Sequence, residues 1–250
     1  SPVWGLSLAD GLTELLTEPG EPIASVALDG VTHTVERVTE PARIEAIRAK
    51  LATDDVLIAD GHHRYGVAQR FRDEMRDAKG PGTAAEDTLV YVSELVGDQL
   101  SVEAIHRLYN DIDLDTLLAA LDTRFERTPA DPATAATLAQ MATDGCLALV
   151  TPSGTEWLTP KPGAFDDVRA LDGVWRETVL EDVAHSVTYQ HGVDRVADAV
   201  ANGDATAAVL IRPVSVAEIE RTAREGVVMP PKSTFFTPKL LTGLVIRPLA

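Results

Sequence analysis

The sequence between residues 55 and 77 constrains the fold more than any other part of the chain. An apolar run at residues 56–59, Val-Leu-Ile-Ala, leads into Asp60 and Gly61. A continuous apolar run is typical of a buried strand, and Gly61 permits a tight turn that other residues resist. The apolar residues that follow recur at helical spacing: Val67, Phe71 and Met75. The pattern predicts a strand, a turn, and a helix that begins at the turn.

The predicted turn is rich in polar side chains that can do chemistry. It contains Asp60, His62, His63 and Arg64. Free N–H groups and the helix dipole at a helix N-terminus attract anions, and the Arg64 guanidinium adds a fixed positive fork. An imidazole at this place could donate or shuttle a proton. We interpret the turn as a pocket for an anion or a phosphate group.

Two other interpretations of the turn remain open. The first is a metal site formed by Asp60 and one adjacent histidine, with further ligands from His106 or His191, although the spacing matches no standard zinc pattern. The second is structural: Asp60 caps the helix, and Arg64 pairs with an acidic neighbour.

A second candidate element contains His106 and Arg107. The alternation of residues predicts a pair of strands over 88–96 and 100–108, with His106-Arg107 at the end of the second strand. If that strand lies beside the strand that ends at Asp60, both strand ends face one crevice, where open α/β sheets bind ligands.

The third candidate element is the proline-bounded segment 228–239, which cannot be helical. Its lysines and small hydroxyl groups suit the binding of phosphate oxygens: Lys232, Ser233, Thr234 and Lys239. The segment is not a Walker loop, because no glycine-rich run precedes the lysine. A structural tail that packs Phe235 and Phe236 into the core is the other interpretation.

Strands and helices alternate along the rest of the chain. A hairpin is predicted over 25–38 around Asp29-Gly30, and a helix with one buried face over 39–51. Paired strands are predicted over 145–151 and 156–159, and a last strand over 244–247. This alternation predicts an α/β (mixed α+β) fold with a mixed sheet and flanking helices. A possible subdivision lies near 128–132.

Charge and composition restrict the possible partners. The 250 residues carry a net charge of −17, which argues against nonspecific binding to nucleic acid or to an anionic membrane. The only cysteine, Cys146, lies in an apolar run and is expected to be a buried structural thiol. No apolar run approaches the roughly 18 residues of a membrane helix. We expect a cytoplasmic protein that binds small molecules.

Three motifs together resemble the bacterial and archaeal domain-of-unknown-function family 1015. They are residues 58–65, His106-Arg107, and Met229-Pro-Pro-Lys-Ser-Thr-Phe-Phe-Thr-Pro-Lys239 followed by Leu-Leu-Thr-Gly-Leu-Val. Members of that family are typically longer and carry His-Glu-x-Thr and Lys-x-x-Asp-Arg motifs upstream, neither of which occurs here. The resemblance implies that residues 1–250 are the C-terminal part of such a protein, and that part of the active site lies upstream.

The turn at Asp60–Arg64 is also similar to the phosphate-binding turn of the ParB and sulfiredoxin superfamily, which includes nucleotide-dependent free-serine kinases. The resemblance implies that Gly61, His62, His63 and Arg64 bind nucleotide phosphates. A kinase also needs a carboxylate that positions the hydroxyl group, and usually Mg²⁺. Asp60 is the nearest candidate for both tasks.

Three functional hypotheses follow. The first is a phosphotransferase that uses ATP or ADP, with Mg²⁺, to phosphorylate a small metabolite hydroxyl such as that of serine. In it, Asp60 holds Mg²⁺ or the hydroxyl, His62 or His63 stabilises the developing charge, and Lys232 and Ser233 close the far side. The second is a nucleotide-binding regulatory module with little turnover. The third is a metal-dependent hydrolase that uses the histidines.

Overall fold

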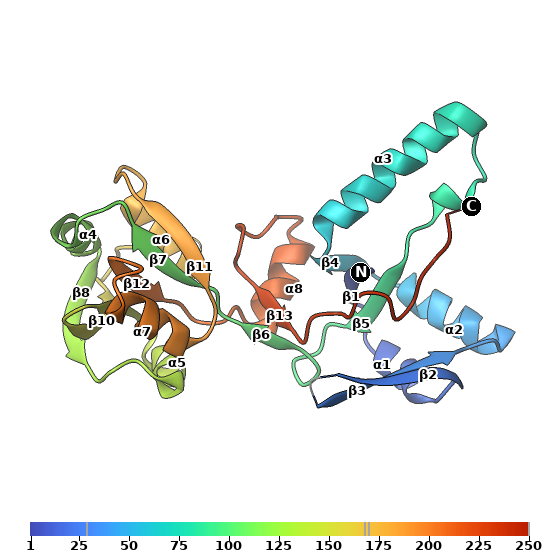
Figure 1. Cartoon of the computed structure of the whole chain (residues 1–250), viewed down its shortest axis with the longest axis horizontal. Helices are drawn as coiled ribbons and strands as arrows, with labels where there is room; N and C mark the ends of the chain where they lie inside the picture. Colours follow the sequence, from blue (N-terminus) through green and yellow to red (C-terminus); the bar gives the residue numbers. More distant parts are fainter. Residues whose placement is uncertain (29, 168, 170, 250) are drawn as a thin grey trace. The chain divides into compact units, whose positions relative to one another are not determined.

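The structure is a computed structural model that describes residues 1–28, 30–167, 169 and 171–249. The chain divides into two compact units (Figure 1). The first consists of Ser1–Ser101 together with Pro238–Ala250, and the second of Val102–Thr237. Residues 128–132, near which the sequence suggested a subdivision, lie within the second unit.

A three-stranded mixed sheet organises the first unit. Its central strand is β1 (Val3–Ser7), which is antiparallel to β4 (Val56–Asp60) and parallel to β5 (Val90–Glu94). Because of these directions, the last residues of β4 lie at the same end of the sheet as the first residues of β1 and β5. The register confirms this, because Trp4 of β1 lies opposite both Asp60 and Tyr91.

Helices and a hairpin complete the first unit. The elements are α1 (Leu12–Thr17), β2 (Glu21–Leu28), β3 (Val31–Arg37), α2 (Pro41–Leu51), α3 (His62–Lys79) and the short 3₁₀ helix η1 (Ala84–Glu86). α1 contacts α2 and β5, and α3 contacts β1 and η1. Strands β2 and β3 pair with each other in an antiparallel hairpin.

The second unit is built on a six-stranded sheet. In spatial order its strands are β11 (Ser186–Gln190), β7 (His106–Asn110), β12 (Ala207–Leu210), β9 (Leu147–Thr151), β10 (Gly154–Pro160) and β8 (Phe125–Ala130). The helices are α4 (Leu114–Leu121), α5 (Ala135–Asp144), α6 (Asp172–Leu180), α7 (Val193–Ala201) and α8 (Val216–Arg224). A two-stranded sheet joins β6 (Ser101–Glu103) to β13 (Phe235–Thr237).

The core of the second unit lies around the central strands of this sheet. All five residues of β9 and all four of β12 are buried, because these strands have neighbours on both sides and apolar side chains on both faces. Cys146 is 2% exposed and belongs to this core, as expected for a structural thiol, and burial raises the pKa of that thiol. No helix within the described ranges is long and apolar enough to cross a membrane.

The main elements predicted from the sequence are confirmed. The fold is a mixed α/β fold in which a mixed sheet is accompanied by helices, and β2–β3 and β9–β10 are the two predicted hairpins. Asp29, which belongs to the predicted hairpin turn, lies outside the described residues. The strand, turn and helix predicted over residues 55–77 correspond to β4, Gly61 and α3.

Several local predictions are wrong. β4 is not a buried strand, because it forms an edge of its sheet and leaves Val56 42% exposed. The helix over 39–51 has no buried residue, and Ile44 is exposed. The segment 244–247 forms no strand, because Gly243 has a positive φ and Pro248 follows it closely.

The predicted strand pair over 88–96 and 100–108 is also wrong. β5 pairs with β1 instead, and the second segment divides into β6 and β7, which belong to different sheets. His106 and Arg107 therefore begin β7 rather than end a strand that follows β5.

Leu149 provides a test of the core. Its side chain is fully buried in β9, so Leu149→Ala should lower the free energy of unfolding by about 2–5 kcal/mol. We would measure urea unfolding in a Trp4→Phe background, in which emission comes from Trp157 and Trp175 of the second unit. Val228→Ala is the control, because Val228 belongs to the same unit, is 86% exposed and should change little. Equal effects of the two substitutions would contradict the assigned core.

Candidate functional site

Gly61 sets the geometry of the turn between β4 and α3. Its φ of 92° lies in the left-handed region, which side chains with a Cβ rarely adopt. A Cβ at this position would also lie 2.7 Å from Nη2 of Arg64 and 2.9 Å from Nε. Glycine is therefore required here both for the backbone conformation and for the close approach of the Arg64 guanidinium.

The N-terminus of α3 is open to a ligand. The first hydrogen bond of the helix runs from the Tyr65 N–H to the Gly61 carbonyl, at 2.9 Å, so the N–H groups of the preceding residues have no acceptor within the helix. The first turn contains no acidic residue that would offset the helix dipole. His62 and His63 are both exposed in this turn. The arrangement can therefore accept an anion.

An ion-pair cluster surrounds the turn. Arg64 Nη2 donates to Asp60 Oδ2 at 2.8 Å, and Lys239 Nζ lies 3.6 Å from Asp60 Oδ1. The three side chains keep 38–44% of their surface exposed. Partial burial opposes ionisation of Asp60, but the hydrogen bond from Arg64 and the charge of Lys239 together hold its pKa below the usual value. The cluster thus has two cations and one carboxylate, a net charge of about +1.

Of the two contacts that the structural interpretation of the turn predicts, only one is observed. Arg64 does pair with an acidic neighbour, Asp60. Within the described residues, however, Asp60 makes no hydrogen bond to a backbone N–H of α3, so it does not cap the helix. The N-terminus of α3 therefore has no side-chain cap within the described residues.

A cavity of about 480 Å³ adjoins the cluster within the first unit. Its walls come from β3, from the beginning of β5, and from the C-terminal segment: His33, Thr34, Val35, Glu36, Leu89, Val90, Tyr91, Leu240, Leu241, Leu244 and Val245. Pro2, Pro238 and Lys239 also line it. Lys239 therefore belongs both to the cavity wall and to the cluster with Asp60.

Sequence patterns could not have identified this cavity. The segments that form its walls are separated by about 50 and 150 residues along the chain, and the candidate motifs reach the cavity only at Pro238 and Lys239. The only signal in the sequence was Lys239, which we singled out as a phosphate ligand. The structure brings Lys239 next to Asp60, which also pairs with Arg64.

His106 and Arg107 lie elsewhere, in the second unit. Both are buried on β7, with exposed fractions of 1% and 0%. His106 Nδ1 accepts a hydrogen bond from the backbone N–H of Ile211 at 3.2 Å. Burial and the charge of Arg107 lower the pKa of His106 to about 4, so this imidazole is neutral near pH 7. Their expected contact with a nucleotide stays a prediction.

The segment before β13 also belongs to the second unit, whereas Lys239 belongs to the first. Lys232 is exposed and has a positive φ of 61°. The hydroxyl of Ser233 is largely buried and donates to the carbonyl of Pro230 at 2.7 Å. Phe236 is buried, as the structural-tail interpretation expected. The phosphate-binding roles of Lys232, Ser233 and Thr234 stay predictions.

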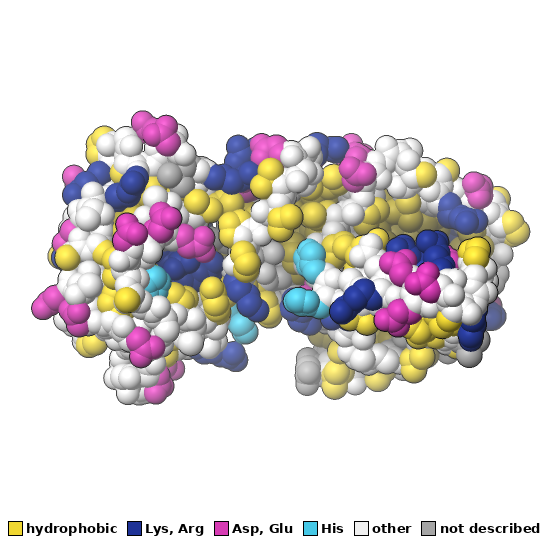
Figure 2. Space-filling model, turned by 90° about the horizontal axis from the view of Figure 1, so that it is seen from above, with side chains coloured by type: hydrophobic (Ala, Val, Ile, Leu, Met, Phe, Trp, Pro, Cys, Tyr) yellow, Lys and Arg dark blue, Asp and Glu magenta, His cyan; other side chains and the backbone are white. Residues whose placement is uncertain are grey.

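The described part of the chain has no group of three His, Cys, Asp or Glu side chains that could hold a metal ion. Asp60 is in the first unit, whereas His106 and His191 are in the second. The metal-hydrolase hypothesis therefore has no complete ligand set within these residues. Figure 2 shows Lys and Arg side chains interspersed with Asp and Glu on the face it presents, so cations form small local groups on that face.

Comparison with solved structures gives remote similarities. A mutant free serine kinase in complex with AMP matches with 15% identity and a TM-score of 0.48, covering 73% of this chain and 67% of the other. Free serine kinase in complex with AMP matches at 16%, with a TM-score of 0.46 and the same coverage. A conserved hypothetical protein from Pyrococcus furiosus matches at 14%, with a TM-score of 0.47, covering 74% and 71%. TM-scores below 0.5 do not establish a shared function.

Comparison of sequences is more decisive. No curated protein matches the chain. Residues 1–174, more than two thirds of the 250, match the family described as protein of unknown function (DUF1015). This match confirms the resemblance seen in the motifs, and the chain belongs to the DUF1015 family.

Proposed function

We propose that this chain binds the phosphate groups of a nucleotide at the N-terminus of α3 and transfers a phosphoryl group to a small hydroxyl compound. The strongest support is the arrangement of Arg64 and Lys239 around Asp60, beside the open helix N-terminus. Helix N–H groups and a guanidinium together form a common binding site for phosphate oxygens. The chain as a whole carries a net charge of −17, so the net positive charge of this cluster is a property of the turn and not of the chain in general.

The adjoining cavity supports a nucleotide rather than a free phosphate ion. Its volume of about 480 Å³ is in the range typical of small-molecule sites, and its walls are mostly apolar. Tyr91 offers an aromatic ring that is held by an edge contact with Trp4, at 6.0 Å between ring centroids. Lys239 connects the cavity to the cluster, so one ligand could place its base in the cavity and its phosphates at Arg64.

The residues of the turn would divide the work as follows. Arg64, Lys239 and the N–H groups of α3 would bind and orient the phosphates. An incoming phosphate competes with Asp60 for both cations, which would free its carboxylate to position the acceptor hydroxyl. His62 or His63 would donate a hydrogen bond to the phosphoryl group in transfer. The resemblance of the turn does not fix the acceptor, and we take serine as the first one to test.

Mg²⁺ could bind at this turn together with the nucleotide, once the phosphates have drawn Arg64 and Lys239 away from Asp60. Mg²⁺ is usually held by one or two carboxylates together with substrate phosphates and water, and Asp60 supplies one carboxylate. When bound, Mg²⁺ neutralises charge on the phosphates.

A nucleotide-binding regulatory module is the second candidate function. Both carboxylate oxygens of Asp60 already have cationic partners, and Asp60 is the only carboxylate in the turn sequence. If this pairing persists in the nucleotide complex, the chain would bind a nucleotide without efficient transfer.

Turnover separates the two candidates. We would incubate the protein with ATP or ADP, Mg²⁺ and L-serine, and measure phosphoserine by mass spectrometry. The phosphotransferase proposal expects formation of phosphoserine that is lost in Asp60→Asn. Nucleotide binding without any phosphoserine would favour the regulatory module.

Removal of the guanidinium should weaken nucleotide binding. Charge-assisted hydrogen bonds contribute about 1.5–3 kcal/mol, so Arg64→Ala should raise the Kd for ADP by about 10-fold to 100-fold in isothermal titration calorimetry. Arg72→Ala is the matched control, because Arg72 lies on the same helix and forms an ion pair with the exposed Asp73. An ADP affinity that is equal in wild type, Arg64→Ala and Arg72→Ala would exclude the proposed phosphate site.

Glycine at position 61 should also be essential for binding. Gly61→Ala introduces a strained φ and forces Arg64 away, so we expect weaker ADP binding and a loss of roughly 1–2 kcal/mol of stability. Gly66→Ala is the control within α3, since a Cβ there meets no atom within 4 Å. It should stabilise the helix by about 0.5–1 kcal/mol and leave binding unchanged. Tighter ADP binding and higher stability in Gly61→Ala than in Gly66→Ala would contradict the geometry of the turn.

A further inference from the structure

Two arginines are buried in the second unit. Arg107 on β7 is 0% exposed, and Arg176 on α6 is 4% exposed. Arginine is almost never fully buried unless its charge is paired, because removing a charge from water costs several kcal/mol. The partners of these two side chains therefore show whether each buried charge is neutralised.

Arg107 has no carboxylate partner within the described residues. Its Nη1 donates to the carbonyl of Ile105, its guanidinium carbon lies 5.1 Å from the centre of the Tyr189 ring, and its Nε has no hydrogen-bond acceptor. Gly173 makes room for it, since a Cβ there would lie 3.3 Å from Arg107 Nη2. Burial and the nearby charge of Arg176 both lower the pKa of Arg107.

Arg176 is only partly compensated. Its Nη2 donates to Glu177 Oε1 at 2.8 Å, but the Glu177 side chain is 48% exposed, and Arg176 Nε has no acceptor. The one buried carboxylate in the described part of the second unit, Asp172, is already bound by Arg212 through three nitrogens. Within the described residues, these two buried positive charges thus have one ion-pair partner, Glu177, which is about half exposed to solvent.

A neutral hydrogen-bond donor lies in the same place. Tyr109 is fully buried, and its hydroxyl lacks a well-formed hydrogen bond. Burial raises the pKa of Tyr109 to about 12, against the effect of the nearby Arg176, so the hydroxyl keeps its proton. Its ring lies 5.7 Å from the ring of His185. Unsatisfied buried donors of this kind need an acceptor.

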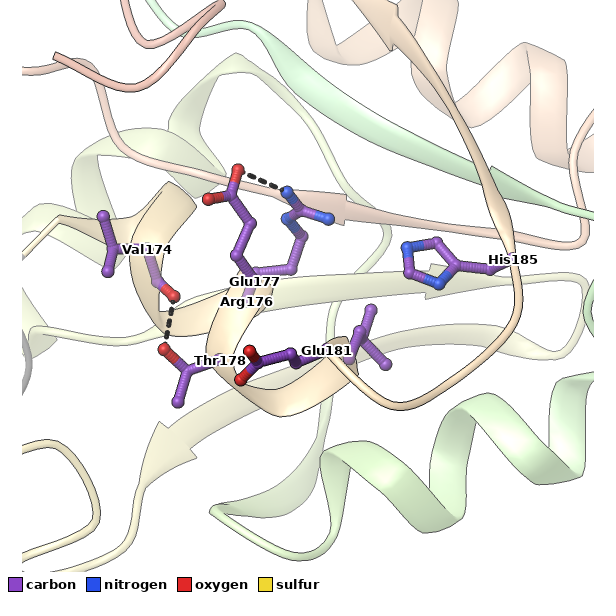
Figure 3. Close-up of a pocket in the computed structure, with 7 residues that line it drawn as sticks. Val174, Arg176, Glu177, Thr178, Glu181 and His185 are labelled. Carbon is purple, nitrogen blue, oxygen red and sulfur yellow. Dashed lines mark hydrogen bonds and ion pairs between the residues drawn. The ribbon is translucent and has the colours of Figure 1, made fainter.

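A cavity of about 450 Å³ opens beside these groups. It is lined by residues of α6 and of the loop that follows: Val174, Arg176, Glu177, Thr178, Leu180, Glu181 and His185. Figure 3 shows the imidazole of His185 facing the side of the cavity that holds Arg176. His185 Nδ1 donates to the carbonyl of Val183 at 2.6 Å, which fixes the orientation of the ring.

We propose that this cavity binds a small oxyanion, the carboxylate or phosphate group of a metabolite, on Arg176, with the charge of Arg107 behind it. The oxyanion supplies the negative charge that the buried pair lacks, and it is bound by the guanidinium of Arg176, which lines the cavity. The ring of His185 forms part of the cavity wall, from the loop after α6. This site is independent of the nucleotide site proposed at α3, because its residues all belong to the second unit.

Thermal unfolding tests the site with two probes, inorganic phosphate and succinate, at ionic strength matched with sodium chloride. The protein carries Trp4→Phe, so that Trp157 and Trp175 report on the second unit, and Arg64→Ala, which removes the guanidinium at α3. A ligand that binds only the folded state raises Tm in a saturable way. We expect one probe or both to do so, and the stronger probe identifies the oxyanion.

Substitution of Arg176 gives the decisive comparison. Arg176→Met should raise the Kd of the active probe by at least about tenfold, and should leave the Tm without anion equal or higher, because a buried, poorly paired charge is removed. Arg176→Lys, which keeps the charge but loses the fork, should bind with intermediate affinity. Arg221→Met is the control, since Arg221 is 52% exposed on α8.

Two results would overturn the proposal. One is the absence of saturable stabilisation by either probe in the parent protein. The other is an anion response that is the same in Arg176→Met, Arg176→Lys and Arg221→Met, which would assign the response to general salt effects. If Arg176→Met does not fold, the Kd of Arg176→Lys decides.

Discussion

The candidate nucleotide site depends on the ion pair between Arg64 and Asp60, in which the guanidinium lies close to Gly61. Gly61 makes room for the guanidinium, and the guanidinium together with Lys239 lowers the pKa of Asp60. An exposed pair of this kind contributes only about 0–1 kcal/mol to stability. Its position beside an uncapped helix N-terminus therefore points to binding rather than to stabilisation of the fold.

The two units present cations in physically different ways. In the first, Arg64 and Lys239 stay partly exposed, so a ligand can displace Asp60 at little cost in desolvation. In the second, Arg107 and Arg176 are removed from water before any ligand arrives. Proteins tolerate such unfavourable arrangements mainly where they serve function. A preorganised, dehydrated arginine binds an oxyanion more strongly than an exposed one does, because less water must be removed.

The sequence contained enough information to predict the turn, the mixed fold and the family. Asp60-Gly61 between an apolar run and a helical repeat is a local pattern, and local patterns determine turns. Strand pairing joins residues that are far apart in the sequence, so local patterns do not determine it. β5 pairs with β1 instead of with residues 100–108, and His106 and Arg107 belong to a different unit from Asp60. The approach of Lys239 to Asp60 and the orphan nitrogens of Arg107 and Arg176 likewise depend on tertiary packing that no spacing encodes.

Amide chemical shifts measured by ¹H–¹⁵N NMR during titration with ADP test the central claim most directly. Because the phosphates should accept hydrogen bonds from the helix N-terminus, the largest changes are expected at the amides of His62, His63 and Arg64, with further changes at Tyr91 and Leu241 in the adjoining cavity. Inorganic pyrophosphate should shift the first group and not the second. Saturable ADP binding that leaves the amides of residues 62–64 unchanged would contradict the account.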